Sequence, residues 1–188
     1  MEEDIIITLP QFLTHAQISK NKFMKISGQR MFVGINHYIR DAIVKKMHHF
    51  IEDHIPEDLE LGDGPYRIRM RFHAPANYGT VKRIRGKISW KPPKDDYVCS
   101  WDADNMWIWG KCFNDVLVNN HYLHDDNVHI IRAAGEVEFV PVDSLEERKI
   151  EFIISKYKDD DKSSEFTKRF SGRVPDRTTK KSRDTGTV

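Results

Sequence analysis

The sequence predicts an α/β fold of the α+β type, in which about four to five strands pack with two main helices. Residues 66–73 alternate apolar and polar side chains, as a half-buried strand does. Residues 37–54 and 105–119 instead repeat apolar side chains at helical spacing. A chain of 188 residues, of which 39% are hydrophobic, suits one domain with a modest core and a tail.

The N-terminal third contains one predicted strand and one predicted helix. Residues 5–9 form a short apolar run that ends at Pro10, which indicates a buried strand. Residues 11–34 have no clean period and are expected to form an extended loop. Asn36 can cap a helix that runs from His37 to about His54. The predicted buried stripe of this helix consists of Tyr38, Ile39, Ala42, Ile43, Met47, Phe50 and Ile51.

The strand at residues 66–73 carries a row of arginines on its polar face. Its apolar side chains alternate with Arg67, Arg69 and Arg71. Like charges along one strand are unfavourable unless an anionic group lies across them, so this face is a candidate contact for DNA phosphates. A solubilising edge strand explains the pattern equally well.

A basic segment follows at residues 79–97 and is expected to contain a hairpin, with residues 81–85 pairing residues 87–90. Basic side chains with an interleaved aromatic, here Trp90, suit contact with DNA by charge and stacking. Anchoring of the loop to the core is the commoner use of such a tryptophan. The predicted DNA-binding residues in this segment are Lys82, Arg83, Arg85, Lys87 and Lys91.

An acidic segment at residues 101–127 is the most informative part of the chain. Asp102, Asp104 and Asn105 stand at its start, and Asp125 and Asp126 stand after the predicted helix. Clustered carboxylates repel one another unless a cation or strong donor lies among them. Oxygen ligands suit Mg²⁺ or Mn²⁺ better than zinc, so the sequence predicts a magnesium site.

The helix after Asn105 presents two different sides. Its predicted core side consists of Met106, Trp109, Phe113, Val116 and Leu117. Lys111, two turns after Asp104, lies on the other side with Asp115. Its ammonium could stabilise charge on a phosphate next to the metal. Lys111 and Asp115 could instead form an ordinary surface pair.

Charge is sorted along the chain although the net charge is only +1. Residues 66–95 contain nine Lys or Arg and one acid, whereas residues 101–155 contain eleven acids and four bases. This division suits a metal-dependent enzyme that acts on a polyanion, and two solvated faces are the alternative. No apolar run is long enough to span a bilayer, and the acidic start lacks a signal-peptide pattern, so a cytoplasmic protein is expected.

The remaining sequence predicts two strands and a tail. Residues 128–142 read as a strand bent near Gly135, and residues 149–155 read as a second strand. Residues 158–188 contain nine bases and six acids with few large apolar residues, so we expect a disordered, mildly basic tail. Cys99 and Cys112 lack metal-ligand spacing and are expected to be free thiols.

Several motifs occur in an order that is characteristic of one family. They are ITLP at residues 7–10, YIRD at 38–41, RIRMRFHAP at 67–75, DADN at 102–105, and then Lys111, Leu117 and the pair Asp125-Asp126. On these motifs, which span residues 5–156, the chain resembles the RusA family of Holliday-junction resolvases. These are small dimeric endonucleases common in bacteriophages and prophages.

The resemblance implies a RusA-like endonuclease domain at residues 1–157 with a small mixed sheet. It implies that Asp102, Asp104 and Asp126 bind Mg²⁺, for which Mn²⁺ can substitute, with Asp125 as an alternative ligand. It also implies that Lys111 is the catalytic lysine and that Asn105 supports the site. The lysine comes one helical turn later than in familiar members, and the basic segment is longer.

The expected function is therefore Mg²⁺-dependent resolution of four-way DNA junctions by paired phosphodiester hydrolysis. The expected partners are branched DNA and a second copy of the chain, with no membrane and no organic cofactor. The location would be the cytoplasm of a bacterial host. Two alternatives remain: a metal-dependent nuclease for other branched or duplex DNA, and a non-catalytic DNA-binding accessory protein.

Overall fold

The computed structural model describes residues 4–20, 22–33, 35–76, 80–84, 87–91 and 101–158, with backbone only at residues 22, 80–84 and 87–91. The chain divides into two units, Met1–Tyr157 and Lys158–Val188. The predicted disordered tail lies outside the described residues, apart from Lys158.

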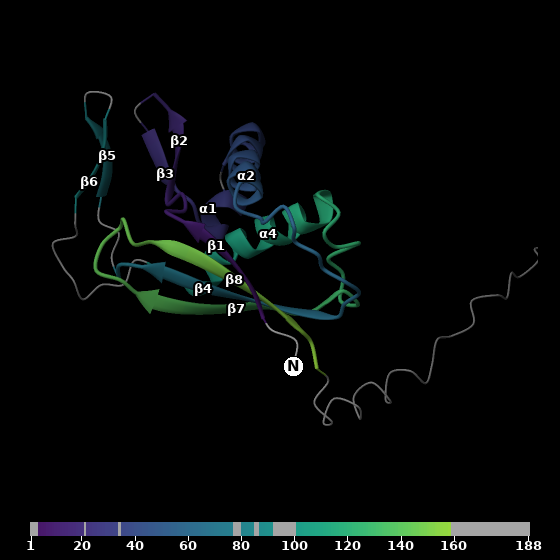
Figure 1. Ribbon diagram of the computed structural model, residues 1–188. Helices are drawn as coiled ribbons and strands as arrows, with labels where there is room; N and C mark the ends of the chain where they lie inside the picture. Colours follow the sequence, from purple (N-terminus) through teal and green to yellow (C-terminus); the bar gives the residue numbers. More distant parts are fainter. Residues whose placement is uncertain are drawn as a thin grey trace, which may run out of the picture. The chain divides into compact units, whose positions relative to one another are not determined.

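A four-stranded mixed sheet forms the centre of the first unit (Figure 1). Its order is β1 (Ile5–Pro10), β8 (Lys149–Lys156), β4 (Tyr66–Ala74) and β7 (Ile131–Pro141). Strands β1 and β4 pair antiparallel with β8, whereas β4 and β7 pair in parallel. The α+β fold with a small mixed sheet, predicted from the sequence, is confirmed.

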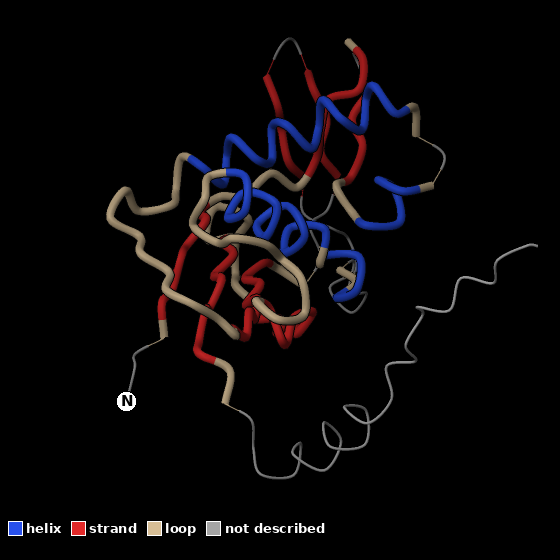
Figure 2. Tube along the Cα trace, turned by 90° about the vertical axis from the view of Figure 1, so that its right-hand side faces the viewer, coloured by secondary structure: helices blue, strands red, loops and turns tan. Residues whose placement is uncertain are grey.

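Two helices, α2 (His37–Glu52) and α4 (Ile108–Asn119), lie on the same side of this sheet in both views (Figures 1 and 2). The rings of Phe113 on α4 and Phe152 on β8 stack at 3.9 Å between their centroids. Alternate strand residues point toward the helices and are almost fully buried. Burial of each apolar side chain away from water contributes roughly 1.5–3 kcal/mol to the free energy of folding. These residues are Ile7, Leu9, Ile68, Met70, Phe72, Ile150, Phe152 and Ile154.

Helix α2 begins where the sequence predicts. The Asn36 side chain accepts a hydrogen bond of 2.9 Å from the backbone N–H of Tyr38 and caps the helix. The buried stripe is narrower than expected, since only Ile43, Met47 and Ile51 are classed as buried within this helix. Tyr38 is 75% exposed, and its inclusion in the core was wrong.

Residues 11–34 are not the extended loop that the sequence suggested. They contain the hairpin of β2 (His15–Ser19) and β3 (Lys22–Lys25) and the short helix α1 (Gly28–Phe32). These elements are too short to produce a readable period, and packing of Phe12, Ile26 and Met31 into the core stabilises them. Tertiary contact has overridden a weak local pattern here.

The predicted hairpin in the basic segment is confirmed as β5 (Thr80–Ile84) and β6 (Lys87–Lys91), which pair antiparallel. The predicted bend in the strand after the acidic segment is also confirmed. Gly135 has φ of +89°, and the β4–β7 register shifts opposite residues 67–69.

The helical pattern after Asp102 forms two helices. The short helix α3 (Ala103–Met106) is separated from α4 by Trp107. The predicted core side, from Met106 to Leu117, is confirmed because all five of its residues are buried. Of the helices in the described part of the chain, none has the length and apolar character needed to cross a membrane.

Candidate active site

Trp101 fixes the start of the acidic segment against the end of β4. Its indole N–H donates a hydrogen bond of 2.5 Å to the carbonyl oxygen of Pro75, which follows β4. Its ring contacts Phe72 at 5.0 Å and Phe12 at 6.3 Å in edge-to-face geometry. Asp102, the next residue, is thus held at a defined position beside the sheet.

Asp102 and Asp104 form a close carboxylate pair at the N-terminal end of α3. The side-chain interaction between them lowers the pKa of Asp102 and raises that of Asp104, so the two exposed carboxylates lie close enough to influence each other. The Asn105 side-chain N–H₂ donates to Asp102 Oδ2 at 2.8 Å. The structure therefore places these two carboxylates side by side, and their role as metal ligands stays a prediction.

Asn105 also ties this pair to α1. Its side-chain oxygen accepts a hydrogen bond of 2.5 Å from the backbone N–H of Gln29. A Cβ atom at Gly28 would lie 3.3 Å from the Asn105 carbonyl oxygen, which is a tight contact. Asn105 thus holds α1 and the carboxylate pair together, a supporting position that agrees with its expected role.

Lys25 is a residue of this site that the sequence reasoning did not find. Its ammonium lies 5.3 Å from the centroid of the Trp101 ring. The pKa of Asp102 is lowered first by the hydrogen bonds from Asp104 and Asn105, and the charge of Lys25 adds to that effect. Lys25 precedes Asp102 by 77 positions in the sequence, and no local motif marks it.

The second acidic pair lies at the opposite end of the sheet. Asn127, next to Asp126, accepts hydrogen bonds from Ile130 and Ile131, and the carbonyl of Ile130 accepts from Tyr66 at the start of β4. Because β4 is nine residues long and separates Tyr66 from Pro75, the two acidic pairs lie on the order of 20 Å apart. The predicted trio of Asp102, Asp104 and Asp126 does not come together within one chain.

Asp125 has local partners instead of a metal-like environment. Its side chain accepts hydrogen bonds from the Asn127 side chain and from the backbone N–H of Asp126, and these bonds lower its pKa. This arrangement is a tight turn in which the carboxylate satisfies nearby donors. The neighbouring carboxylate, that of Asp126, is exposed at the same turn.

Lys111 forms the ordinary helix-surface pair that the sequence allowed as an alternative. Its ammonium lies 3.3 Å from Asp115 Oδ1, one turn later on α4. The other carboxylate oxygen of Asp115 lies 3.8 Å from His48 Nε2 on α2. Lys111 therefore extends along the side of α4 that faces α2.

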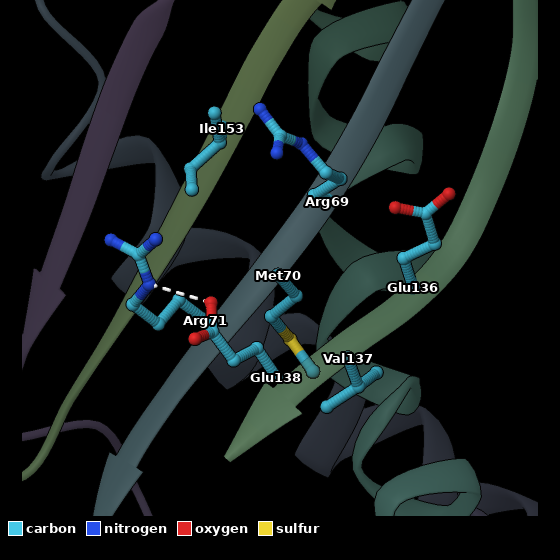
Figure 3. A pocket seen from close by; sticks show the side chains of 7 residues that line it. All are labelled: Arg69, Met70, Arg71, Glu136, Val137, Glu138 and Ile153. Carbon is cyan, nitrogen blue, oxygen red and sulfur yellow. Dashed lines mark hydrogen bonds and ion pairs between the residues drawn. The ribbon is translucent and has the colours of Figure 1, made fainter. Parts of the chain in front are cut away.

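The arginines of β4 are paired with carboxylates on the open face of the sheet. Figure 3 shows Arg69, Arg71, Glu136 and Glu138 around a surface pocket between β4 and β7. The pairs are Arg67 with Glu136 at 2.6 Å, Arg69 with Asp4 at 3.0 Å, and Arg71 with Glu138 at 2.9 Å. The anionic groups opposite this arginine row thus come from the protein itself.

Strand β4 is also not an edge strand, because it lies between β8 and β7. The sequence alternative of a solubilising edge strand was therefore wrong. The hydrogen bond with Glu138 raises the pKa of Arg71, and a further contact with Glu151 adds to it. Binding of DNA phosphates to these arginines would have to displace carboxylates that are already in place.

The predicted DNA-binding residues of the basic segment cannot be placed individually. The backbones of Lys82, Arg83, Lys87 and Lys91 belong to β5 and β6, but their side chains are outside the described residues. Arg85 and Trp90 are outside the described side chains as well. Strands β5 and β6 pair antiparallel, with Val81 opposite Trp90 and Arg83 opposite Ile88.

The carboxylate pair is an incomplete set of ligands for a divalent ion. Two neighbouring carboxylates and a nearby amide provide the oxygen donors that Mg²⁺ prefers. Among the described residues, however, no group of three or more acidic, histidine or cysteine side chains is arranged to hold a metal. The described part of one chain thus supplies two carboxylates at this place and no third ligand of that kind.

No known protein-family model matches this chain, and no curated protein sequence matches it.

Proposed function

We propose that this protein is a Mg²⁺-dependent endodeoxyribonuclease that resolves four-way DNA junctions. The observation that supports the proposal most directly is the pair of Asp102 and Asp104, held together by Asn105. Keeping two exposed carboxylates at hydrogen-bonding distance is unfavourable without a proton or a cation between them. A site of this kind is suited to a hard divalent ion and hence to phosphate chemistry.

The residues of the pair would hold the ion, and the scaffold would orient them. Asp102 and Asp104 supply oxygen ligands, and the Asn105 side chain keeps Asp102 in position by donating to it. Trp101 fixes the pair relative to the sheet, so that the ligands need little reorganisation when the ion binds. When bound, Mg²⁺ supplies charge neutralisation for the phosphate and makes water a better nucleophile at neutral pH.

A homodimer would complete the set of ligands. Because Asp126 lies on the order of 20 Å from the pair in its own chain, Asp126 of the partner subunit is the third ligand that we propose. A two-fold dimer exchanges this contribution in both directions and so contains two identical sites. Two symmetric sites are what the paired cleavage of a four-way junction requires.

The basic hairpin is the surface that we propose for DNA. Strands β5 and β6 carry Lys82, Arg83, Lys87 and Lys91, and Arg85, which falls between them in the sequence, lies outside the described residues. Contacts of this kind with the phosphate backbone give affinity without sequence preference. The arginines of β4 are weaker candidates, because Arg67, Arg69 and Arg71 already pair with carboxylates.

Incubation of the purified protein with a synthetic immobile four-way junction tests this function. We expect symmetric nicks in opposite strands with Mg²⁺ or Mn²⁺ and none in EDTA. Flap and plain duplex substrates of the same sequence serve as controls for substrate class. Faster cutting of flaps or duplexes would favour the alternative of a nuclease with another substrate.

A non-catalytic DNA-binding accessory protein is the second candidate. The observation that favours it is the absence, among the described residues, of a group of three potential metal ligands in one chain. This candidate predicts junction binding that is indifferent to Mg²⁺ and no cleavage of any substrate. With either function, we propose that the protein acts in the cytoplasm of a bacterial cell, where DNA is accessible.

A further inference from the structure

We propose that Lys25, at the end of β3, is the lysine that contacts the scissile phosphate at the carboxylate pair. Resemblance gives that role to Lys111, which belongs to α4 and the acidic segment. The inference rests on the proposed function, since it assigns a catalytic residue for the same reaction. It concerns a residue that no motif in the sequence connects with the pair.

The position of Lys25 is fixed by the residue that precedes Asp102. Its ammonium lies 5.3 Å from the centroid of the Trp101 ring, a distance typical of cation–π contacts. Trp101 is itself held by its hydrogen bond to Pro75 and by two aromatic neighbours. The ammonium is thus held over a rigid group that is directly bonded to the first metal-ligand candidate.

The backbone on both sides of Lys25 is equally well anchored. In the β2–β3 hairpin Lys25 is the register partner of His15, and the next residue, Ile26, is buried and donates a hydrogen bond of 3.0 Å to Thr14. Four residues after Lys25, the backbone N–H of Gln29 donates to the side chain of Asn105. The segment from β3 to α1 therefore packs along the DADN motif and carries Lys25 with it.

Lys111 is less suited to the same task. Its ammonium lies 3.3 Å from Asp115, whose carboxylate faces His48 on α2. Its position two helical turns beyond Asp104, and not this pairing, makes it the weaker candidate. The position one helical turn after Asp104, at Ile108, is 5% exposed and apolar, so α4 presents no cation there. A phosphate that approaches two carboxylates needs a nearby positive charge, and β3 supplies one where α4 does not.

The chemical role follows from the charge balance of hydrolysis. Attack of water on phosphorus forms a P–O bond and breaks the bond to the leaving oxygen, which takes up a proton from solvent. Negative charge grows on the phosphate oxygens during this step. An ammonium that donates a hydrogen bond to one of these oxygens stabilises the charge, and loss of one such donor slows enzymes by about 100- to 1,000-fold.

Four variants test the assignment, together with the wild type. Lys25→Met removes the charge and keeps an aliphatic stem against Trp101, Lys25→Arg keeps the charge, Lys111→Met removes the charge on α4, and Lys20→Met is a matched control in the same hairpin. The readouts are single-turnover cleavage of the junction in Mg²⁺, junction affinity in EDTA at several salt concentrations, and the melting temperature.

We expect Lys25→Met to lower the cleavage rate about 100-fold or more, with partial recovery in Lys25→Arg. Its affinity for the junction should fall about fivefold. The slope of the logarithm of affinity against the logarithm of salt concentration should decrease by about the amount expected for one phosphate contact. Lys111→Met and Lys20→Met should stay within about threefold of the wild-type cleavage rate. Unchanged melting temperatures would exclude loss of folding as the cause.

Two results would overturn the inference. A Lys25→Met protein that cuts at the wild-type rate while Lys111→Met is inactive would return the role to Lys111 and leave the proposed function intact. A wild-type protein that cuts no substrate would remove the proposed function and with it the catalytic role of Lys25. The EDTA affinities then still decide whether Lys25 touches DNA, because they do not depend on cleavage.

Discussion

At the scale of single residues, the carboxylate pair determines what the site can bind. Asp102 and Asp104 are both exposed, yet their side chains lie close enough for each to shift the pKa of the other. Bulk water would allow them to turn apart, so the donor Asn105 and the anchored Trp101 matter as much as the acids. Under the proposed function, the pair would need little rearrangement to bind a cation.

Replacement of Asp104 by Asn keeps the size and the hydrogen-bonding capacity of the side chain but removes its charge. We expect Asp104→Asn to bind the junction with wild-type affinity in EDTA and to lose cleavage by about 100-fold or more in Mg²⁺. Gel-shift and single-turnover assays measure the two effects. Asp58→Asn, an exposed acid outside the pair, is the control, and cleavage by Asp104→Asn at the wild-type rate would remove the metal assignment.

His15 shows how burial changes a single titration. Burial, followed by the nearby charge of Lys25, lowers the pKa of His15 from 6.5 to about 4. As the pH falls, the imidazole of His15 is therefore protonated in the unfolded chain before it is protonated in the folded protein. The contribution of neutral His15 to the free energy of unfolding is complete above pH 6.5 and decreases as the pH falls toward 4. Because the side chain is partly exposed, we expect the free energy of unfolding to decrease by about 2 kcal/mol from this group as the pH falls through that range.

The pH dependence can be measured by urea denaturation at pH 7.5, 6.5, 5.5 and 4.5. We expect His15→Gln to flatten the loss of stability between pH 6.5 and 4.5 compared with the wild type. His49→Gln, which is exposed on α2, is the matched control and should keep the wild-type slope. Identical slopes for the wild type and His15→Gln would contradict the assignment.

At the scale of elements, sequence patterns identified the long elements and missed the short ones. Helix α2, strand β4 and strand β8 have clear periods that agree with burial on one face, so their prediction succeeded. Strands β2 and β3 and helix α1 have four or five residues each, too few for a period. Because Lys25 stands on β3, the sequence could not indicate its place in the site either.

Long-range geometry was the other limit of prediction. The motif at residues 102–105 was recognisable because its members are adjacent in sequence. The distance to Asp126 depends on how β4 and α4 are laid out, and no local pattern contains that information. The carboxylate partners of the β4 arginines were equally hidden, since they come from β7 and from Asp4.

The end of α4 offers a test of backbone conformation. His121 has φ of +63° just after the helix, a conformation that costs a non-glycine residue roughly 1–2 kcal/mol. We expect His121→Gly to raise the free energy of unfolding by about 1 kcal/mol, measured by urea denaturation. His124→Gly, in the same turn region without a positive φ, should not stabilise the protein, and a gain at both sites would refute the conformational argument.

Gly110 on α4 packs directly against the ring of Trp107, the residue between α3 and α4, and leaves no room for a side chain. A Cβ atom at Gly110 would lie 2.6 Å from ring atoms of Trp107. Alanine usually stabilises a helix interior by about 1 kcal/mol relative to glycine, but here we expect Gly110→Ala to destabilise the protein by about 1–3 kcal/mol. Gly62→Ala, whose Cβ would meet only Lys156 Nζ at 4.0 Å, is the control.

At the scale of the whole molecule, the proposed site belongs to two chains. Each chain contributes Asp102 and Asp104 from one end of its sheet and Asp126 from the other. A two-fold dimer built this way makes both sites depend on the same contact between subunits. This arrangement allows a test that does not require a structure of the dimer.

Mixing two inactive variants provides that test. In a heterodimer of Asp104→Asn and Asp126→Asn subunits, one site receives both changes and the other site receives neither. We expect each variant alone to be inactive and the mixture to nick a single strand of the junction, at up to half the wild-type number of cuts. Continued inactivity of the mixture, with heterodimers verified by differential tags, would mean that the three aspartates act within one chain.

The length of β4 has a consequence for the cell that carries this protein. If Asp126 of the partner subunit completes the site, as we propose, a single subunit lacks one of the three ligands, because nine residues of strand separate the two acidic turns. The cleavage rate per subunit would then fall as the protein is diluted, in proportion to its concentration, once that concentration is below the dissociation constant of the dimer. Intact chromosomes would be spared until enough copies accumulate to meet on a branched target.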